Sequence, residues 1–157
     1  GDQTTIGETT VEDNGATLRL SGNNWQSIEV DYVITPNTVV ELDFSSTNEG
    51  ELHGFGFDVD NQYGGYKQRI NFAGTQNASD VSAYDNHPMD GSTKHYVINM
   101  GLHDSGYKHR MYFMVDNDAS ESGESIFSNV RIYERYDAAI ALQIYLQAVA
   151  FFQRTLK

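Results

Sequence analysis

The sequence predicts an all-β protein, a β-sandwich of the jelly-roll type followed by an apolar C-terminal α-helix. Short stretches of alternating apolar and polar residues recur along residues 1–135, and this period of two is typical of half-buried strands. Turns rich in Gly, Asn and Asp, such as Asp13-Asn14-Gly15, separate the stretches. Residues 138–153 then carry no charge, Gly or Pro. We therefore expect a sandwich domain at 1–135 and a helical tail at 136–157.

Each expected strand is a short alternating stretch bounded by turn residues. The third is the clearest, because Val40, Leu42 and Phe44 alternate with acidic and polar neighbours. The polar stretch 73–93 has little periodicity, and a loop of this length in a compact domain is usually functional or mobile. The expected strands are 16–21, 26–33, 38–46, 52–58, 66–72, 95–101, 110–116 and 125–134.

The composition limits the classes of ligand. At 157 residues the chain is long enough to bury the core of one domain. Ten Lys and Arg against 22 Asp and Glu give a net charge of −12, which opposes binding to nucleic acid and to anionic membranes. The absence of Cys rules out disulfides and thiolate metal sites. Neutral ligands and divalent cations fit this charge.

Two acidic strings resemble each other. GFGFDVDN at 54–61 and YFMVDNDAS at 112–120 both run from an alternating strand into a cluster of Asp and Asn. If the two strands lie side by side, four carboxylates meet at one edge of a sheet, and hard oxygen ligands of this kind suit Ca²⁺. Two ordinary solvated turns are the alternative. The candidate ligands are Asp58, Asp60, Asn61, Asp116, Asn117 and Asp118.

The segment DNGATLRLSGNNWQSIEVDYVITPNTVVELDFSSTNEGELHGFGFDVDN, together with SIFSNVRIYE near the end of the domain, resembles jelly-roll carbohydrate-binding modules. Such modules are appended to bacterial polysaccharide-degrading enzymes, and the resemblance covers roughly residues 8–134. It implies non-catalytic binding of a neutral polysaccharide or oligosaccharide, a bound Ca²⁺, and a secreted bacterial protein. It also suggests a second, structural cation site at which Glu8 or Glu12 joins Asn129.

Sugar rings stack on exposed aromatic side chains, so Tyr and Trp in turns are candidate platforms. Tyr63 and Tyr66 flank Gly64-Gly65 and are the first choice. Trp25 follows the turn Gly22-Asn23-Asn24, although a lone Trp that enters a strand is more often part of the core. The remaining candidates are Tyr84 and Tyr107.

Two other functions stay open. The residue types of a small jelly-roll polysaccharide lyase occur at 66–69 and 107–110, but the net charge disfavours a uronate substrate. A calcium-stiffened adhesive or filament-forming surface domain is the third possibility. The uncharged stretch 138–153 is shorter than the ~18 residues that a membrane-spanning helix needs. We therefore expect it to mediate self-association.

Overall fold

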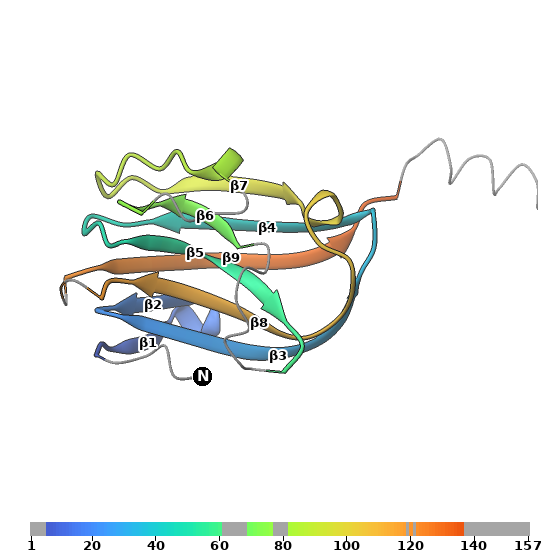
Figure 1. Cartoon of the computed structure of the whole chain (residues 1–157), viewed down its shortest axis with the longest axis horizontal. Helices are drawn as coiled ribbons and strands as arrows, with labels where there is room; N and C mark the ends of the chain where they lie inside the picture. Colours follow the sequence, from blue (N-terminus) through green and yellow to red (C-terminus); the bar gives the residue numbers. More distant parts are fainter. Residues whose placement is uncertain (1–5, 61–68, 77–81, 119, 121, 137–157) are drawn as a thin grey trace, which may run out of the picture.

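The computed structural model describes residues 6–60, 69–76, 82–118, 120 and 122–136, and in this part of the chain the all-β sandwich is confirmed. Two antiparallel sheets face each other (Figure 1). The first sheet has the strand order β1-β2-β9-β4-β7, and the second has the order β3-β8-β5-β6. The strands are β1 (Thr9–Glu12), β2 (Thr17–Ser21), β3 (Asn24–Ile34), β4 (Thr38–Ser45), β5 (Leu52–Asp58), β6 (Ile70–Ala73), β7 (Lys94–Asn99), β8 (Gly106–Asp116) and β9 (Glu124–Glu134).

The sequence did not predict β1, a short strand that pairs with β2 at the edge of the first sheet as far as the chain is described. Its four residues TTVE include one apolar side chain, so no alternation marks it. Residues 66–68 of the expected fifth strand lie outside the described residues. The corresponding strand of the structure, β6, begins at Ile70. The expected tail helix at 138–153 also lies outside them. Among the helices that are described, none is long and apolar enough to cross a bilayer.

The core lies between the two sheets and is rich in aromatic rings. Phe44 of β4 packs on Phe72 of β6 and Phe127 of β9, with ring centroids 5.0 and 5.4 Å apart. Alternation along each strand points one set of side chains into this space. The apolar residues of the core are Leu20, Ile34, Val40, Leu42, Phe44, Phe55, Phe57, Ile70, Phe72, Tyr96, Ile98, Met100, Met111, Phe113, Val115 and Phe127.

His53 of β5 is a polar member of this interior and is fully buried. Its Nε2 accepts a hydrogen bond from the Gly50 backbone N–H at 2.6 Å, and its Nδ1 lies 2.8 Å from the Ser125 Oγ. Burial lowers the pKa of His53 from 6.5 to about 4, so the imidazole is neutral near pH 7. The pair of hydrogen bonds fixes the turn that leads into β5.

Candidate functional site

The outer face of the second sheet collects polar and aromatic side chains from β3, β8 and β5. Met111, Phe113 and Val115 of β8 point into the core, so alternation places Tyr112 and Asp116 on the outer face. The strand register then fixes their neighbours. Three rows cross this face, namely Glu29–Arg110–Asp58, Ser27–Tyr112–Gly56 and Trp25–Met114–Gly54–Asn71.

Trp25 and Tyr112 form an aromatic pair on this face. Their ring centroids are 5.5 Å apart and their planes make an angle of 25°. Both side chains are half-buried, so part of each ring remains accessible. A Cβ atom on Gly56 would come within 2.3 Å of the Tyr112 hydroxyl, which shows that the tyrosine lies directly over the bare backbone of β5. The glycine is therefore required for the position of the ring.

An acidic triad of Glu51, Asp116 and Asp118 lies at one end of the same face. One carboxylate oxygen from each of the three lies within 4.8 Å of the others. Antiparallel pairing brings the end of β8 beside the start of β5, where the Glu51 N–H donates to the Asp116 carbonyl oxygen at 2.7 Å. The local sequence places Asp118 two residues beyond the strand, so its carboxylate can turn back toward the other two.

The triad and the aromatic pair are joined by a hydrogen bond from the Trp25 Nε1–H to the Asp116 Oδ1 at 2.9 Å. Asp116 is only 9% exposed. Burial raises the pKa of Asp116 above 3.8, and the negative charges of Asp118 and Glu51 add to this, while the bond from Trp25 and the positive charge of Arg69 oppose it. Asp116 is thus a carboxylate whose charge is costly even with Arg69 near it, and a further cation beside it would lower this cost.

Neutral amide groups orient the other two carboxylates. The Asn23 Nδ2–H donates to the Asp118 Oδ1 at 2.6 Å, and the Asp118 backbone N–H donates to the Glu51 Oε2 at 2.7 Å. These donors hold the oxygens in place without cancelling their charge. Ca²⁺ binds oxygen at 2.3–2.6 Å, so two ligands of one ion lie at most about 5 Å apart. The spacing in the triad fits this limit.

The structure does not bring the four predicted Asp carboxylates together. Strands β5 and β8 run antiparallel, so Leu52 pairs with Asp116 while Asp58 pairs with Arg110. Six residue steps along β8 correspond to about 20 Å. Asp58 therefore lies at the opposite end of the face, where its carboxylate accepts the Val59 N–H at 2.6 Å, and exposed Asp60 follows it.

Asn117 lies within the acidic end of the face, where its side-chain amide hydrogen-bonds a neighbouring serine. Its Nδ2–H donates to the Ser120 Oγ at 3.0 Å, and its backbone N–H donates to the Asn23 Oδ1 at 3.3 Å. Asn61 lies outside the described residues. Of the six predicted ligands, the structure thus places Asp116 and Asp118 together.

The predicted aromatic platforms are scattered. Tyr63 and Tyr66 lie outside the described residues. Tyr84 packs edge-on against Tyr96, with centroids 6.4 Å apart, away from the triad. Tyr107 is 53% exposed at the other end of β8, where its hydroxyl donates to the Asp31 carboxylate. Trp25 is the predicted aromatic residue that the structure places beside the acidic triad.

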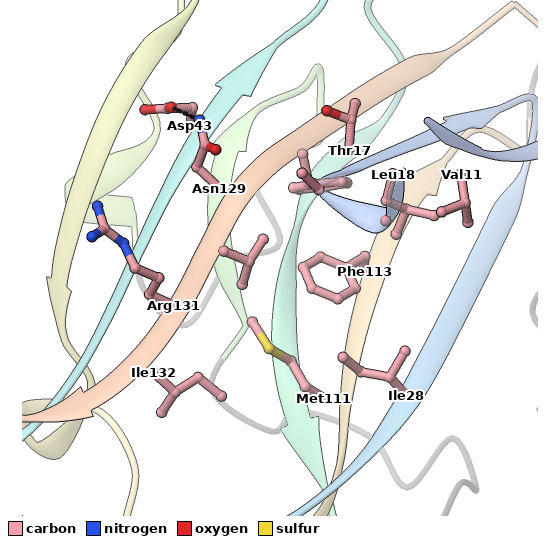
Figure 2. Close-up of a pocket in the computed structure, with 14 residues that line it drawn as sticks. Val11, Thr17, Leu18, Ile28, Asp43, Met111, Phe113, Asn129, Arg131 and Ile132 are labelled. Atoms are coloured by element: carbon pink, nitrogen blue, oxygen red, sulfur yellow. Dashed lines mark hydrogen bonds between the residues drawn. The ribbon is translucent and has the colours of Figure 1, made fainter. Parts of the chain in front are cut away.

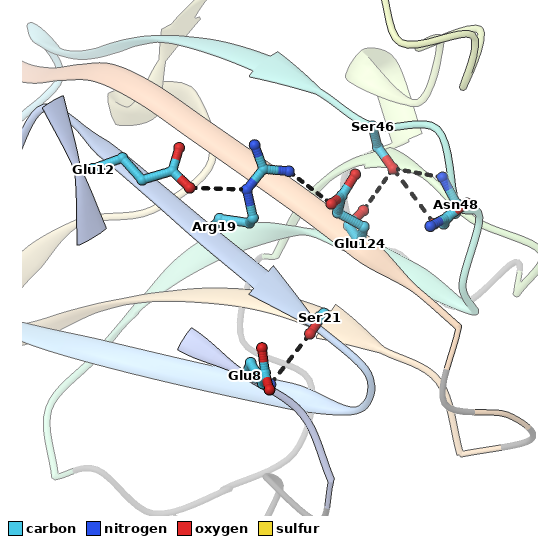
Figure 3. A network of polar contacts seen from close by, with 7 residues as sticks. All are labelled: Glu8, Glu12, Arg19, Ser21, Ser46, Asn48 and Glu124. Carbon is cyan, nitrogen blue, oxygen red and sulfur yellow. Dashed lines mark hydrogen bonds and ion pairs between the residues drawn. The ribbon is translucent and has the colours of Figure 1, made fainter. Parts of the chain in front are cut away.

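The expected second cation site between the first and last strands is replaced by an ion-pair network (Figure 3). Arg19 of β2 contacts Glu12 at 3.1 Å and Glu124 at 2.7 Å, and so links β1 to β9 with a side-chain cation. Asn129 instead donates from Nδ2 to the Asp43 Oδ2 at 2.8 Å. The Glu8 backbone N–H donates to the Ser21 Oγ at 3.2 Å. Of the proposed ligands of that site, the side chains of Glu12 and Asn129 therefore have other partners, whereas Glu8 makes its hydrogen bond to Ser21 through its backbone.

Sequence reasoning missed Glu51 and Tyr112. Glu51 precedes a strand in the segment Asn48-Glu49-Gly50-Glu51, where nothing distinguishes it from its neighbour Glu49. Tyr112 offers a usable signal, because it lies between Met111 and Phe113 and must face away from them. The pairing of Tyr112 with Trp25 depends on strand register, which no local pattern gives.

Comparison of the chain with protein-family models, with curated proteins and with solved structures finds no match. Function is therefore inferred from the geometry of the site.

Proposed function

We propose that this domain is a non-catalytic, calcium-dependent carbohydrate-binding module of a secreted bacterial protein, and that it binds a neutral polysaccharide. The observation that carries the proposal is the hydrogen bond from the Trp25 Nε1–H to the Asp116 Oδ1. It makes the aromatic pair and the acidic triad parts of one site. Stacking surfaces beside oxygen ligands are the two features that sugar binding through a cation needs.

Ca²⁺ is held by the carboxylates of Glu51, Asp116 and Asp118 in this proposal. Three negative charges within 4.8 Å repel one another, and a divalent cation reverses this repulsion. The bound ion supplies a positive charge that attracts sugar hydroxyl oxygens. The buried position of Asp116 limits solvent screening and so strengthens its contribution.

Trp25 and Tyr112 provide the apolar surface on which a sugar ring stacks. The faces of pyranose rings carry C–H groups, which pack on aromatic rings while the hydroxyls point outward. The bond to Asp116 holds the indole in one orientation, so less conformational entropy is lost on binding. The net charge of −12 favours a neutral glycan over an acidic one.

Isothermal titration calorimetry on the whole chain tests the proposal. We expect Ca²⁺ alone to bind, and a neutral polysaccharide from a plant and algal panel to bind only when Ca²⁺ is present. Asp116→Asn should weaken both events, whereas Asp58→Asn, at the opposite end of the face, should weaken neither. Polysaccharide binding that is equally strong in EDTA would refute the role of calcium, and no binding to any glycan in the panel would refute the function.

A further inference from the structure

An apolar groove opens between the two sheets, on the side where β2 and β3 are close (Figure 2). Its cavity volume is about 810 Å³. Figure 2 shows Ile28 of β3, Met111 of β8 and Ile132 of β9 around a common space. The lining residues are mostly apolar, and the main ones are Val11, Leu18, Ile28, Met111, Phe113 and Ile132.

The groove exists because the strands differ in length. β2 pairs with β9 only from Ser21–Glu124 to Thr17–Ser128, whereas β9 continues to Glu134. Beyond Ser128, no described strand pairs with β9 on the side of β2. β3, in the facing sheet, continues to Ile34. Inward-facing side chains of β3 and β9 therefore lack a covering strand among the described residues.

The uncovered side chains are large and apolar. Ile28 shares a row with the core residue Met111 and so faces inward, yet it is 52% exposed. Val11 of β1 is 65% exposed at the rim, while Val130 and Ile132 of β9 are half-buried. A contiguous exposed patch of this kind is typical of a surface that is covered by another element.

The charged side chains at the rim are already paired. Asp43 accepts a hydrogen bond from Asn129 at 2.8 Å, and its second oxygen lies 2.6 Å from the His95 Nδ1. The Arg131 Nη2 lies 2.8 Å from a carboxylate oxygen of Glu41. An occupant of the groove thus needs no charge of its own.

We propose that residues 138–153 of the same chain fold back and cover this groove. The segment AAIALQIYLQAVAFFQ is uncharged throughout and apolar apart from three Gln, which matches an apolar groove with paired charges at its rim. β9 lines the groove up to Ile132, and only five residues separate Ile132 from Ala138. This inference is independent of the sugar-binding proposal.

The length of the segment is sufficient to cover the groove, and tethering favours the same chain as its source. Sixteen residues in a helix span about 24 Å, which exceeds the roughly 17 Å that β9 covers from Phe127 to Ile132. A short connection gives the segment an effective concentration on the order of millimolar at the groove. A second copy at micromolar concentration competes poorly with it.

Limited proteolysis of full-length variants tests the proposal. Chymotrypsin cleaves after aromatic residues, and the segment contains Tyr145, Phe151 and Phe152. We expect Ile28→Asp and, independently, Val11→Asp to accelerate cleavage within 138–153 about tenfold, which corresponds to ~1.4 kcal/mol. Val97→Asp is the matched control, because Val97 is 44% exposed on β7 and does not line the groove.

Circular dichroism shows whether each variant keeps its β-sheet content, and analytical ultracentrifugation gives the mass of each. Cleavage at the same rate in both groove variants and in the control would overturn the proposal. A wild-type dimer that becomes a monomer in both groove variants would also overturn it, because the segment would then occupy the groove of a second copy. A monomeric wild type whose sites in 138–153 are cleaved more slowly than those of the two groove variants supports the proposal.

Discussion

Replacing Asp116 with Asn should remove most of the thermal stabilisation that calcium gives to this protein. Asp116 contributes one of three carboxylates within 4.8 Å and is 9% exposed. Ca²⁺ at a hundredfold excess over its Kd stabilises the folded state by ~2.7 kcal/mol, which corresponds to a rise of about 5–10 °C in Tm for a domain of this size. If the variant binds a hundredfold more weakly, the same calcium concentration adds only ~0.4 kcal/mol, or about 1 °C.

Differential scanning calorimetry in EDTA and in excess Ca²⁺ measures this shift. Asp58→Asn serves as the control, since Asp58 pairs with Arg110 at the far end of β5 and should keep the full shift. Equal calcium shifts in the wild type and in Asp116→Asn would refute the assignment of the triad as the cation site. Loss of the shift in Asp58→Asn alone would favour a site at the other end of the face.

The same substitution should stabilise the calcium-free protein in a pH-dependent way. Burial, with the charges of Asp118 and Glu51, raises the pKa of Asp116 above 3.8. The unfolding free energy therefore falls as pH rises from 3.8 through the folded-state pKa. We expect Asp116→Asn to be more stable than the wild type at pH 7 in EDTA, and to lose this advantage below pH 3.8. Urea unfolding at both pH values checks the sign, and an equal advantage at both would contradict it.

Three further substitutions, with Tyr107→Ala as a control, probe the platform and the core. Trp25→Ala should weaken sugar binding about ten- to hundredfold in affinity electrophoresis, as expected for a lost stacking contact, whereas Tyr107→Ala should retain wild-type affinity. Gly56→Ala should also weaken sugar binding, because the added Cβ would lie 2.3 Å from the Tyr112 hydroxyl and displace the ring; unchanged affinity would mean that the ring position is unimportant. The wild type should lose ~3 kcal/mol of unfolding free energy as pH falls from 6.5 to 4, because folded His53 resists protonation. Urea titrations across this pH interval should show that His53→Gln lacks this loss of unfolding free energy.

The β-sandwich could be predicted because the signal for each long strand is local. Val40, Leu42 and Phe44 alternate with polar residues, and β4 occupies Thr38–Ser45, close to the expected 38–46. β1 was missed because its segment Thr9–Glu12 contains a single apolar residue. Pairing with β2, which is a tertiary effect, makes this segment a strand.

The site could be predicted only in part, because its geometry depends on strand direction. The two acidic strings look alike, and placing them side by side assumes that their ends meet. Antiparallel pairing of β5 and β8 instead sends Asp58 and Asp116 to opposite ends of the face. It also brings Glu51, just before β5, to the position beside the second string where the first string had been expected. The position of Glu51 beside Asp116 can be predicted only when the strand register is known.

The hydrogen bond between Trp25 and Asp116 has a practical consequence, since Trp25 is the single tryptophan of the chain. Its indole fluorescence therefore comes from the candidate site and from nowhere else in the protein. Calcium bound to Asp116 beside the indole N–H, or a sugar ring that excludes water from the indole face, should shift the emission maximum. Both ligands can thus be titrated by their effect on emission, without a label and without an engineered probe.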